Sequence, residues 1–302
     1  MNGVLKEIAH SSRLYDYEVV CGAAEEKDYP QEYEIPRENT GTLKNQGTIG
    51  ACVACVISQI AEVLHKMEFD ESLEVSEGFI YGTFRKDNHK GEGLYVSQAL
   101  EYWRTIGTVP KHYFDILKEM PKMKETVKKF PELLDIATKY KIHGYVSINY
   151  ADRARKDLVI KKALTENSYP LLAVSDEYFR ESHCIELVGW NDKTGCYKIK
   201  NSWGETYGDH GFAEIPKDEV NAVYMIIPQE IELPFDDVKK EDWFYKYIKN
   251  SYCNGTMKGT SATTFEPNRY VTRAELAVVI DNLKKDNDRL VSIINKLVNE
   301  KV

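Results

Sequence analysis

A cysteine, a histidine and an asparagine stand at separations that suit nucleophilic catalysis. Cys52 lies in the stretch NQGTIGACVAC, His183 follows 131 residues later in ESHCIELVGW, and Asn201 comes another 18 residues on in KNSWGETYGDHG. A thiol nucleophile needs a base to accept its proton and a donor that stabilises the oxyanion. Residues that are this far apart in the chain can meet in the folded protein, so these three predict a thiol nucleophile with a histidine base.

The residues after Cys52 predict the element that positions it. Apolar residues recur at helical spacing in this stretch, at Val53, Val56, Ile57, Ile60, Ala61 and Leu64. Cys52 would therefore stand at the N-terminus of a buried helix. The helix dipole at that end favours a thiolate over a thiol and so raises the nucleophilicity of the cysteine.

With these motifs, residues 38–228 resemble the papain family of cysteine peptidases. The block from Gln46 to Cys52, the histidine strand and the Asn-Ser-Trp-Gly block occur in the family's order. The resemblance implies that Cys52 is the nucleophile, His183 the general base and then acid, and Asn201 the residue that holds the imidazole. It also implies that Gln46 and the backbone N–H of Cys52 form the oxyanion hole, and that Trp203 shields the hydrogen bond between Asn201 and His183 from water.

The chain also departs from the family pattern. Ile49 stands where a cysteine usually precedes the nucleophile, the usual disulfide partner region reads HKGEGLY, and Val53 replaces a tryptophan. The fold must therefore close without that disulfide. An inactive cleft that only binds peptides is the alternative to an enzyme.

Cys52 and Cys55 form a CxxC pair, which is also typical of metal and redox sites. No second CxxC or histidine pair accompanies it, and Cys55 falls on the buried side of the expected helix. We therefore expect Cys55 to be a core residue, and we expect no metal and no cofactor. A histidine in an apolar strand can likewise be a core residue, which is the structural alternative for His183.

The segment EGLYVSQALEYWRTIG resembles the part of the family that lines the substrate cleft. The resemblance implies a substrate-binding set that borders the S2 pocket: Gly93, Leu94, Tyr95, Val96, Val174 and Cys184, with Trp203 nearby. These residues are mostly apolar, so we expect an apolar P2 side chain in the peptide or protein substrate. A purely structural role is the alternative.

Residues 1–37 precede the peptidase-like block and would be a short pro-segment, so the protein would be a zymogen. The acidic, tyrosine-rich stretch ending at Pro36 could lie across the cleft. The alternative is a strand and loop packed on the domain.

Residues 229–285 contain a short acidic linker and a segment that resembles a single S-layer homology repeat. In that family three repeats commonly bind secondary cell-wall polysaccharide through the arginine of a TRAE block. Arg273 is thus the glycan-binding candidate, and a solvated or structural arginine is the alternative. Thr272 and Glu275 predict a capping box at the start of a helix.

Residues 276–302 have the heptad pattern of a coiled coil. Leucines recur every seven residues at Leu276, Leu283, Leu290 and Leu297, and Ile280, Asn287 and Ile294 occupy the other core position. We expect a homo-oligomer through this helix. Packing of the helix onto its own chain is the alternative.

We expect an α+β fold: a papain-like peptidase with a helical subdomain and a β-barrel-like subdomain, followed by a small helical module and a terminal helix. The runs IELVGW, CYKIKNS, GFAEI and AVYMII predict strands of the second subdomain. The net charge of -8 argues against nucleic acid as a partner. No apolar run is long enough for a membrane span, and the first residues lack the pattern of a secretory signal. The repeat suggests a bacterial cell surface, with a cytoplasmic location as the alternative.

Overall fold

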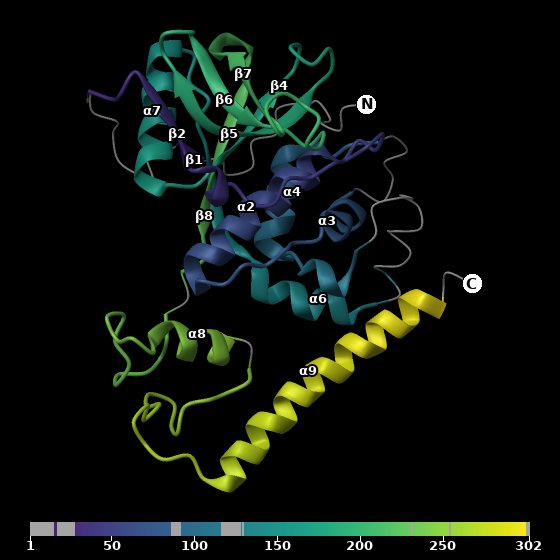
Figure 1. The fold of residues 1–302 in the computed structure, drawn as a ribbon, viewed down its shortest axis with the longest axis vertical. Coiled ribbons are helices and arrows are strands. Elements are labelled where there is room, and N and C mark those ends of the chain that lie inside the picture. Colours follow the sequence, from purple (N-terminus) through teal and green to yellow (C-terminus); the bar gives the residue numbers. More distant parts are fainter. Residues whose placement is uncertain are drawn as a thin grey trace. The chain divides into compact units, whose positions relative to one another are not determined.

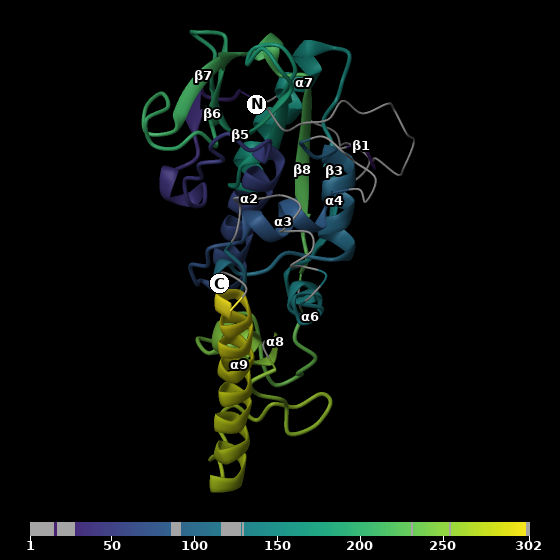
Figure 2. The same cartoon turned by 90° about the vertical axis from the view of Figure 1, so that its right-hand side faces the viewer.

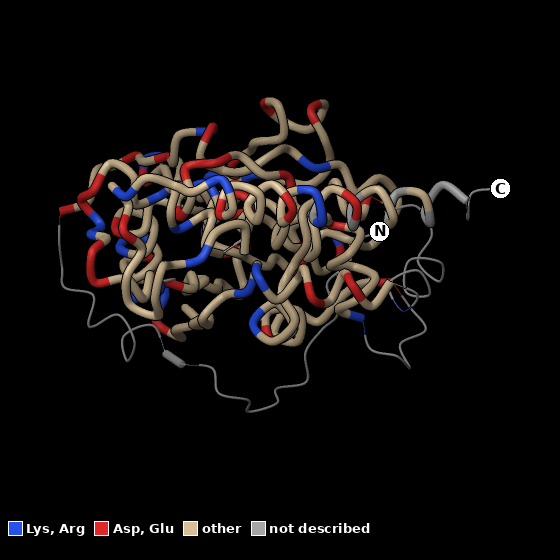
Figure 3. The backbone as a smooth tube through the Cα atoms, turned by 90° about the horizontal axis from the view of Figure 1, so that it is seen from below, with Lys and Arg blue, Asp and Glu red and all other residues tan. Residues whose placement is uncertain are grey.

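The computed structural model describes residues 15–16, 28–85, 92–115, 128, 130–230, 232–253 and 255–299. It divides into two compact units (Figures 1 and 2). Unit 1 consists of Met1–Leu64 and Leu73–Gln229, and unit 2 consists of His65–Ser72 and Glu230–Val302. Acidic and basic residues are interspersed along the described chain (Figure 3).

The central helix of unit 1, α2, spans Cys52–Phe69, so Cys52 is its first residue as the apolar spacing predicts. The spacing predicts one buried face, but all thirteen residues from Cys52 to Leu64 are buried. In Figure 1 the strands lie on one side of this helix, and the helices labelled α3 and α6 lie on the other. Its polar residues Ser58, Gln59 and Glu62 are therefore in the interior as well, and Cys55 is a core residue as predicted.

Shorter helices complete the helical part of unit 1. They are α3 (Glu77–Thr83), α4 (Val96–Thr105) and α6 (Glu132–Ala137), with 3-10 turns at Arg37–Asn39, Lys111–Tyr113 and Thr138–Tyr140. Ser76 caps α3 by accepting a hydrogen bond from the backbone N–H of Phe79 at 3.0 Å.

The described strands form one sheet in the order β1-β3-β8-β4-β5-β6-β7, and β2 pairs with β5. All pairs are antiparallel except β1 with β3. The strands are β1 (Tyr15–Asp16), β2 (Glu32–Glu34), β3 (Ile142–Ser147), β4 (Leu171–Ser175), β5 (His183–Asn191), β6 (Cys196–Lys200), β7 (Phe212–Pro216) and β8 (Ala222–Pro228). The last four confirm the strands expected from the sequence.

Helix α7 (Arg153–Asn167) connects β3 to β4 and packs on β5. Asp152 caps it, and its buried residues Val159, Ile160, Ala163 and Leu164 form one face. A 3-10 turn at Lys217–Glu219 precedes β8. This mixed architecture of helices and an antiparallel sheet agrees with the α+β fold that the sequence predicts.

Part of the N-terminal segment belongs to the sheet. Residues Glu32–Glu34 pair with Gly189–Asn191 at the far end of β5 from His183, and Tyr33 stacks on Trp190 with ring centroids 4.8 Å apart. The hypothesis that the stretch lies across the cleft is therefore wrong for Glu32–Glu34. The alternative, a strand packed on the domain, is correct for these residues. Residues 17–27 lie outside the described part of the chain.

Unit 2 has a small core of its own. Phe235, Val238 and Ile248 are buried, the last on helix α8 (Tyr245–Cys253). Within this unit Lys249 of α8 forms an ion pair with Glu68, and Asn250 donates a hydrogen bond to Glu71 Oε1 at 2.6 Å. The end of α2 is thus a part of unit 2.

Helix α9 spans Arg273–Asn299 and begins with the expected capping box. The N–H of Glu275 donates to Thr272 Oγ1 at 3.1 Å, and the N–H of Thr272 donates to Glu275 Oε2 at 2.8 Å. Leu276, Ile280 and Leu283 are each about half exposed, at 47%, 56% and 53%. The side chains of Leu290, Ile294 and Leu297 lie outside the described part. Among the described residues no helix is both long and apolar enough to cross a membrane.

Candidate active site

The cysteine of the site lies where a loop enters α2. Residues 46–51 form this loop, with Gly47 at φ +57°, and Cys52 is fully buried. Its place in the first turn of α2 puts the thiol at the positive end of the helix dipole. Burial raises the pKa of the Cys184 thiol, and a negative charge on Cys52 would raise it further. Cys52 and Cys184, the residue after His183, belong to the same buried core cluster.

His183 and Asn201 come together through the pairing of β5 with β6. The Nε2 atom of His183 lies 2.7 Å from Asn201 Oδ1, and the backbone N–H of Ser202 donates to that same oxygen at 2.7 Å. The backbone N–H can only donate, so the shared atom is an acceptor and Nε2 of His183 carries the hydrogen. The Nδ1 atom of His183 is consequently the one with the lone pair. It is buried and has no hydrogen-bond partner within the described structure.

Aromatic rings enclose the imidazole of His183. The ring centroid of Phe179 lies 4.8 Å away, edge to face, and that of Trp203 lies 4.9 Å away. Burial lowers the pKa of His183 to about 4, although the hydrogen bond with Asn201 acts in the opposite direction. The imidazole is therefore neutral over most of the pH range as long as its neighbours are uncharged, which suits a base.

Gln46 is connected to the same group of residues. Its Nε2 donates to the carbonyl of Ile49 at 2.9 Å, its Oε1 accepts from Ser202 Oγ at 2.6 Å, and its backbone N–H donates to the carbonyl of Ser202 at 2.8 Å. Ser202 thus joins Gln46 to Asn201. Sequence reasoning did not single out Ser202 or Phe179, although Ser202 directly follows Asn201 in the motif.

The expected substrate-binding residues fall into two groups within unit 1. Gly93 to Val96 form a continuous segment that leads into α4, and the N–H of Gly93 donates to Tyr81 Oη at 3.1 Å. Leu94 and Val96 are buried, and Tyr95 is half-buried. Val174 and Cys184 face each other across β4 and β5. Arg273 is the first residue of α9 in unit 2 and is exposed.

A carboxylate stands near the place where the family pattern has a disulfide. Glu92 Oε2 accepts a hydrogen bond at 2.8 Å from the backbone N–H of Gly50, next to Ile49. This contact links the loop before Cys52 to the segment that begins with Gly93. Val53 is fully buried and fills the core beside the nucleophile. The sequence offered no signal for Glu92, because the contact depends on how two distant loops meet.

Two family models match the chain. The model described as papain family cysteine protease matches residues 29–229, and the model described as S-layer homology domain matches residues 234–277.

Individual relatives agree with both matches. A cysteine protease of Blomia tropicalis is 23% identical over an alignment of 202 positions, which covers 58% of this chain and 57% of the relative. A surface-layer 125 kDa protein of Lysinibacillus sphaericus is 41% identical over 51 residues, which are 17% of this chain and 4% of the relative. The chain thus spans less than two thirds of the curated relatives that it matches. Among solved structures, xylellain, a cysteine protease from Xylella fastidiosa, superposes with a TM-score of 0.59 at 18% identity, over 76% of this chain and 96% of that one.

Proposed function

The chain belongs to the papain family of cysteine proteases, and from that premise we propose that it is an endopeptidase that acts through an acyl-enzyme on Cys52. The peptidase domain would comprise residues 38–228. The observation that carries the proposal is the orientation of His183, whose Nε2–H is held by Asn201 while Nδ1 keeps its lone pair. A base in this tautomer is ready to accept a proton on Nδ1.

In the proposed reaction His183 Nδ1 accepts the proton of the Cys52 thiol, and the thiolate attacks the carbonyl carbon of the scissile peptide bond. The negative oxygen that forms would accept hydrogen bonds from the Gln46 amide and the backbone N–H of Cys52. His183 then gives its proton to the leaving amine, which departs as the thioester forms. Water hydrolyses the thioester after giving a proton to His183, and Cys52 is regenerated.

The contacts of Gln46 support its part in this scheme. The hydrogen bonds with Ile49 and Ser202 hold both ends of its side-chain amide, so its orientation is set before substrate arrives. A donor that is oriented in advance needs no reorganisation during the reaction. Trp203 and Phe179 would exclude water from the pair of His183 and Asn201, which strengthens their hydrogen bond.

For the substrate we propose a peptide with an apolar P2 side chain. Gly93, Leu94, Tyr95, Val96, Val174 and Cys184 would border its pocket. Apolar walls favour buried apolar area and disfavour charge. A peptide library that varies P2 tests this, and an acidic P2 residue that outperforms leucine would contradict it.

For the C-terminal part we propose attachment to a bacterial cell surface. Residues 229–285 would bind secondary cell-wall polysaccharide, with Arg273 as a contact to acidic sugar substituents. The match to the S-layer homology model supports this proposal. Sedimentation of the full chain with purified wall polysaccharide tests it, with a chain that ends at Pro228 and an Arg273→Gln variant as controls. Equal sedimentation of the full and shortened chains would contradict it.

An epoxysuccinyl cysteine-protease probe tests the central proposal. We expect the probe, under reducing conditions, to modify Cys52 alone, as mapped by mass spectrometry, and we expect hydrolysis of a peptide substrate that Cys52→Ala abolishes. Cys184 serves as an internal control, because burial raises the pKa of its thiol and so disfavours the reactive thiolate. A folded protein that is neither labelled nor active would instead favour the alternative function, an inactive cleft that binds peptides.

A further inference from the structure

The residues that lead to Gln46 are held by two buried side chains of opposite charge. Lys200, which is 1% exposed, donates from Nζ to the carbonyl oxygens of Thr40, Gly41 and Thr42 at 2.5, 2.8 and 3.4 Å. Three consecutive carbonyls thus point at one ammonium group.

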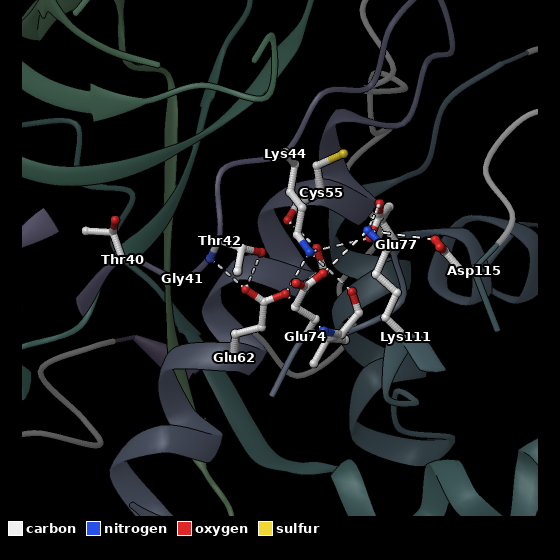
Figure 4. Close-up of polar contacts among 12 residues, drawn as sticks. Thr40, Gly41, Thr42, Lys44, Cys55, Glu62, Glu74, Glu77, Lys111 and Asp115 are labelled. Carbon is white, nitrogen blue, oxygen red and sulfur yellow. Dashed lines mark hydrogen bonds and ion pairs between the residues drawn. The ribbon is translucent and has the colours of Figure 1, made fainter. Parts of the chain in front are cut away.

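Glu62, which is 4% exposed, binds the donors of the same segment (Figure 4). Its Oε2 accepts from both the backbone N–H and the hydroxyl of Thr42, each at 2.7 Å. Its Oε1 accepts from Lys44 Nζ at 2.7 Å and from the N–H of Val75 at 2.9 Å. Four donors therefore surround this carboxylate.

The two charged residues come from the elements next to Cys52 and Asn201. Lys200 is the last residue of β6 and directly precedes Asn201, and Glu62 lies on α2, the helix that begins with Cys52. The backbone of residues 40–42 is thus tied on one side to α2 and on the other to β6, which ends directly before Asn201.

The segment also lies directly against α2. Gly41 has φ +71°, and a Cβ atom at this position would lie 2.5 Å from the carbonyl oxygen of Gln59. A buried charge that loses its partners is costly, so the polar contacts of Glu62 and Lys200 leave the segment little freedom to shift.

We propose that Glu62 and Lys200 are positioning residues for the oxyanion hole, because they set the place of Gln46 relative to the N-terminus of α2. The proposal rests on the roles given above to Gln46 and Cys52. Neither residue contacts the reacting atoms; each acts through residues 40–46. A misplacement of about 1 Å at a catalytic group costs on the order of 100-fold in rate.

The test compares Glu62→Gln with Lys111→Met. Lys111 belongs to the same group of charges, at 3.6, 3.5 and 3.7 Å from Glu74, Glu77 and Asp115, and no described hydrogen bond joins its side chain to residues 40–46 (Figure 4). Three readouts are needed: kcat and KM with a peptide substrate, the affinity of a peptide aldehyde, and the rate of alkylation by iodoacetamide against pH. The aldehyde forms a tetrahedral adduct whose oxygen would lie at the oxyanion hole, whereas alkylation of the thiolate places no oxygen there.

For Glu62→Gln we expect kcat and aldehyde affinity to fall together, by about 10-fold to 100-fold, with KM nearly unchanged and the alkylation profile preserved. Lys111→Met should stay within about twofold of the parent protein in all three readouts. Thr42→Val removes one hydrogen bond to Glu62 and should give a smaller loss of the same kind, about threefold to 10-fold. If Glu62→Gln does not fold, Thr42→Val serves as the test of the proposal.

On the other side of the segment, Lys200→Met should show the same losses as Glu62→Gln. Lys198→Met is its control, because Lys198 lies on the same strand but pairs with Glu32 and Glu34.

Folded Glu62→Gln and Lys200→Met proteins with unchanged aldehyde affinity, in an active parent, would overturn this inference alone. Alkylation that falls in parallel with turnover would also overturn it, because the defect would then lie at the thiol. A parent protein without turnover or aldehyde binding would overturn the proposed function and, with it, this inference.

Discussion

His183 shows how surroundings decide the protonation of a single residue. Rings of Phe179 and Trp203 lie against the imidazole, and burial lowers its pKa to about 4. A thiolate beside it would act in the opposite direction, because a negative charge stabilises the imidazolium. The charge of His183 therefore depends on the state of Cys52.

Removal of the thiol should reveal this dependence. In Cys52→Ala we expect the His183 ring to stay neutral down to about pH 4, whereas a thiolate in the parent protein should raise its pKa. NMR of the histidine ring nitrogens against pH measures both. The prediction fails if His183 in Cys52→Ala titrates at an ordinary histidine value.

Glu186 is a second residue whose proton depends on burial. Its side chain is fully buried, its two oxygens accept no hydrogen bond within the described structure, and the Nζ atom of Lys200 is 3.6 Å away. Burial raises its pKa to about 8, although Lys200 opposes this. A carboxyl whose pKa is raised by folding is most favourable when protonated, so its ionisation costs stability as the pH rises from about 4.5 to about 8.

Glu186→Gln should therefore have a higher free energy of unfolding than the parent protein. The difference should grow as the pH rises from about 4.5 to about 8 and stay constant above pH 8. We expect a difference on the order of 1 to 3 kcal/mol near pH 7, because the amide has no proton to lose. Urea unfolding at pH 5, 6, 7, 8 and 9 measures it. A stability difference that does not change with pH would refute the prediction.

At the scale of elements, strand β2 gives part of the N-terminal segment a structural role in the sheet. Tyr33 stacks on Trp190, and Lys198 pairs with Glu32 and Glu34 at 2.6 and 2.9 Å. Exposed ion pairs contribute little, so most of the stabilisation comes from the ring and the strand pairing. We proposed residues 1–37 as an inhibitory pro-segment, and this stays a proposal for the residues outside β2.

Tyr33→Ala separates a structural strand from an inhibitor. We expect the free energy of unfolding to fall by about 1 to 2 kcal/mol, because a half-buried ring and its stacking are lost. The labelling rate of Cys52 should not change, and Tyr33→Phe should retain most of the stability. Faster labelling in Tyr33→Ala would show that this strand restricts access to the cleft.

At the scale of the whole molecule, unit 2 presents an apolar face with no described cover. Leu276, Ile280 and Leu283 lie on α9 at heptad positions and are about half exposed. Exposed apolar residues in this pattern are typical of helices that pair with another copy. Asn287 at a core position favours a dimer, whereas the additional apolar residues favour higher order.

We expect the protein to be oligomeric at micromolar concentration by light scattering. Ile280→Asp with Leu283→Asp should give a monomer, because two buried charges would oppose pairing. Asp288→Asn, on the same helix away from the heptad core and the positions that flank it, should leave the mass unchanged. A monomeric parent protein would contradict the coiled coil and favour α9 packing on its own chain.

The sequence alone singled out Gln46, Cys52, His183 and Asn201 as candidate site residues and predicted the elements that carry them. Apolar spacing predicted the helix after Cys52, alternating and apolar runs predicted β5 to β8, and Thr272 with Glu275 predicted the start of α9. These features could be predicted because each depends on neighbours within a few residues along the chain.

Only the tertiary structure decided how these residues act on one another. His183 on β5 meets Asn201 at the end of β6, and the N–H of Ser202 makes the shared oxygen an acceptor, so His183 Nε2 carries the hydrogen. The contacts of Glu62 and Lys200 with residues 40–42 join positions up to 160 residues apart. The sequence predicted one buried face for α2, but the fold encloses every side of the helix from Cys52 to Leu64, so Glu62 is buried as well. Contacts between distant segments depend on how all elements pack at once, and no local pattern records that.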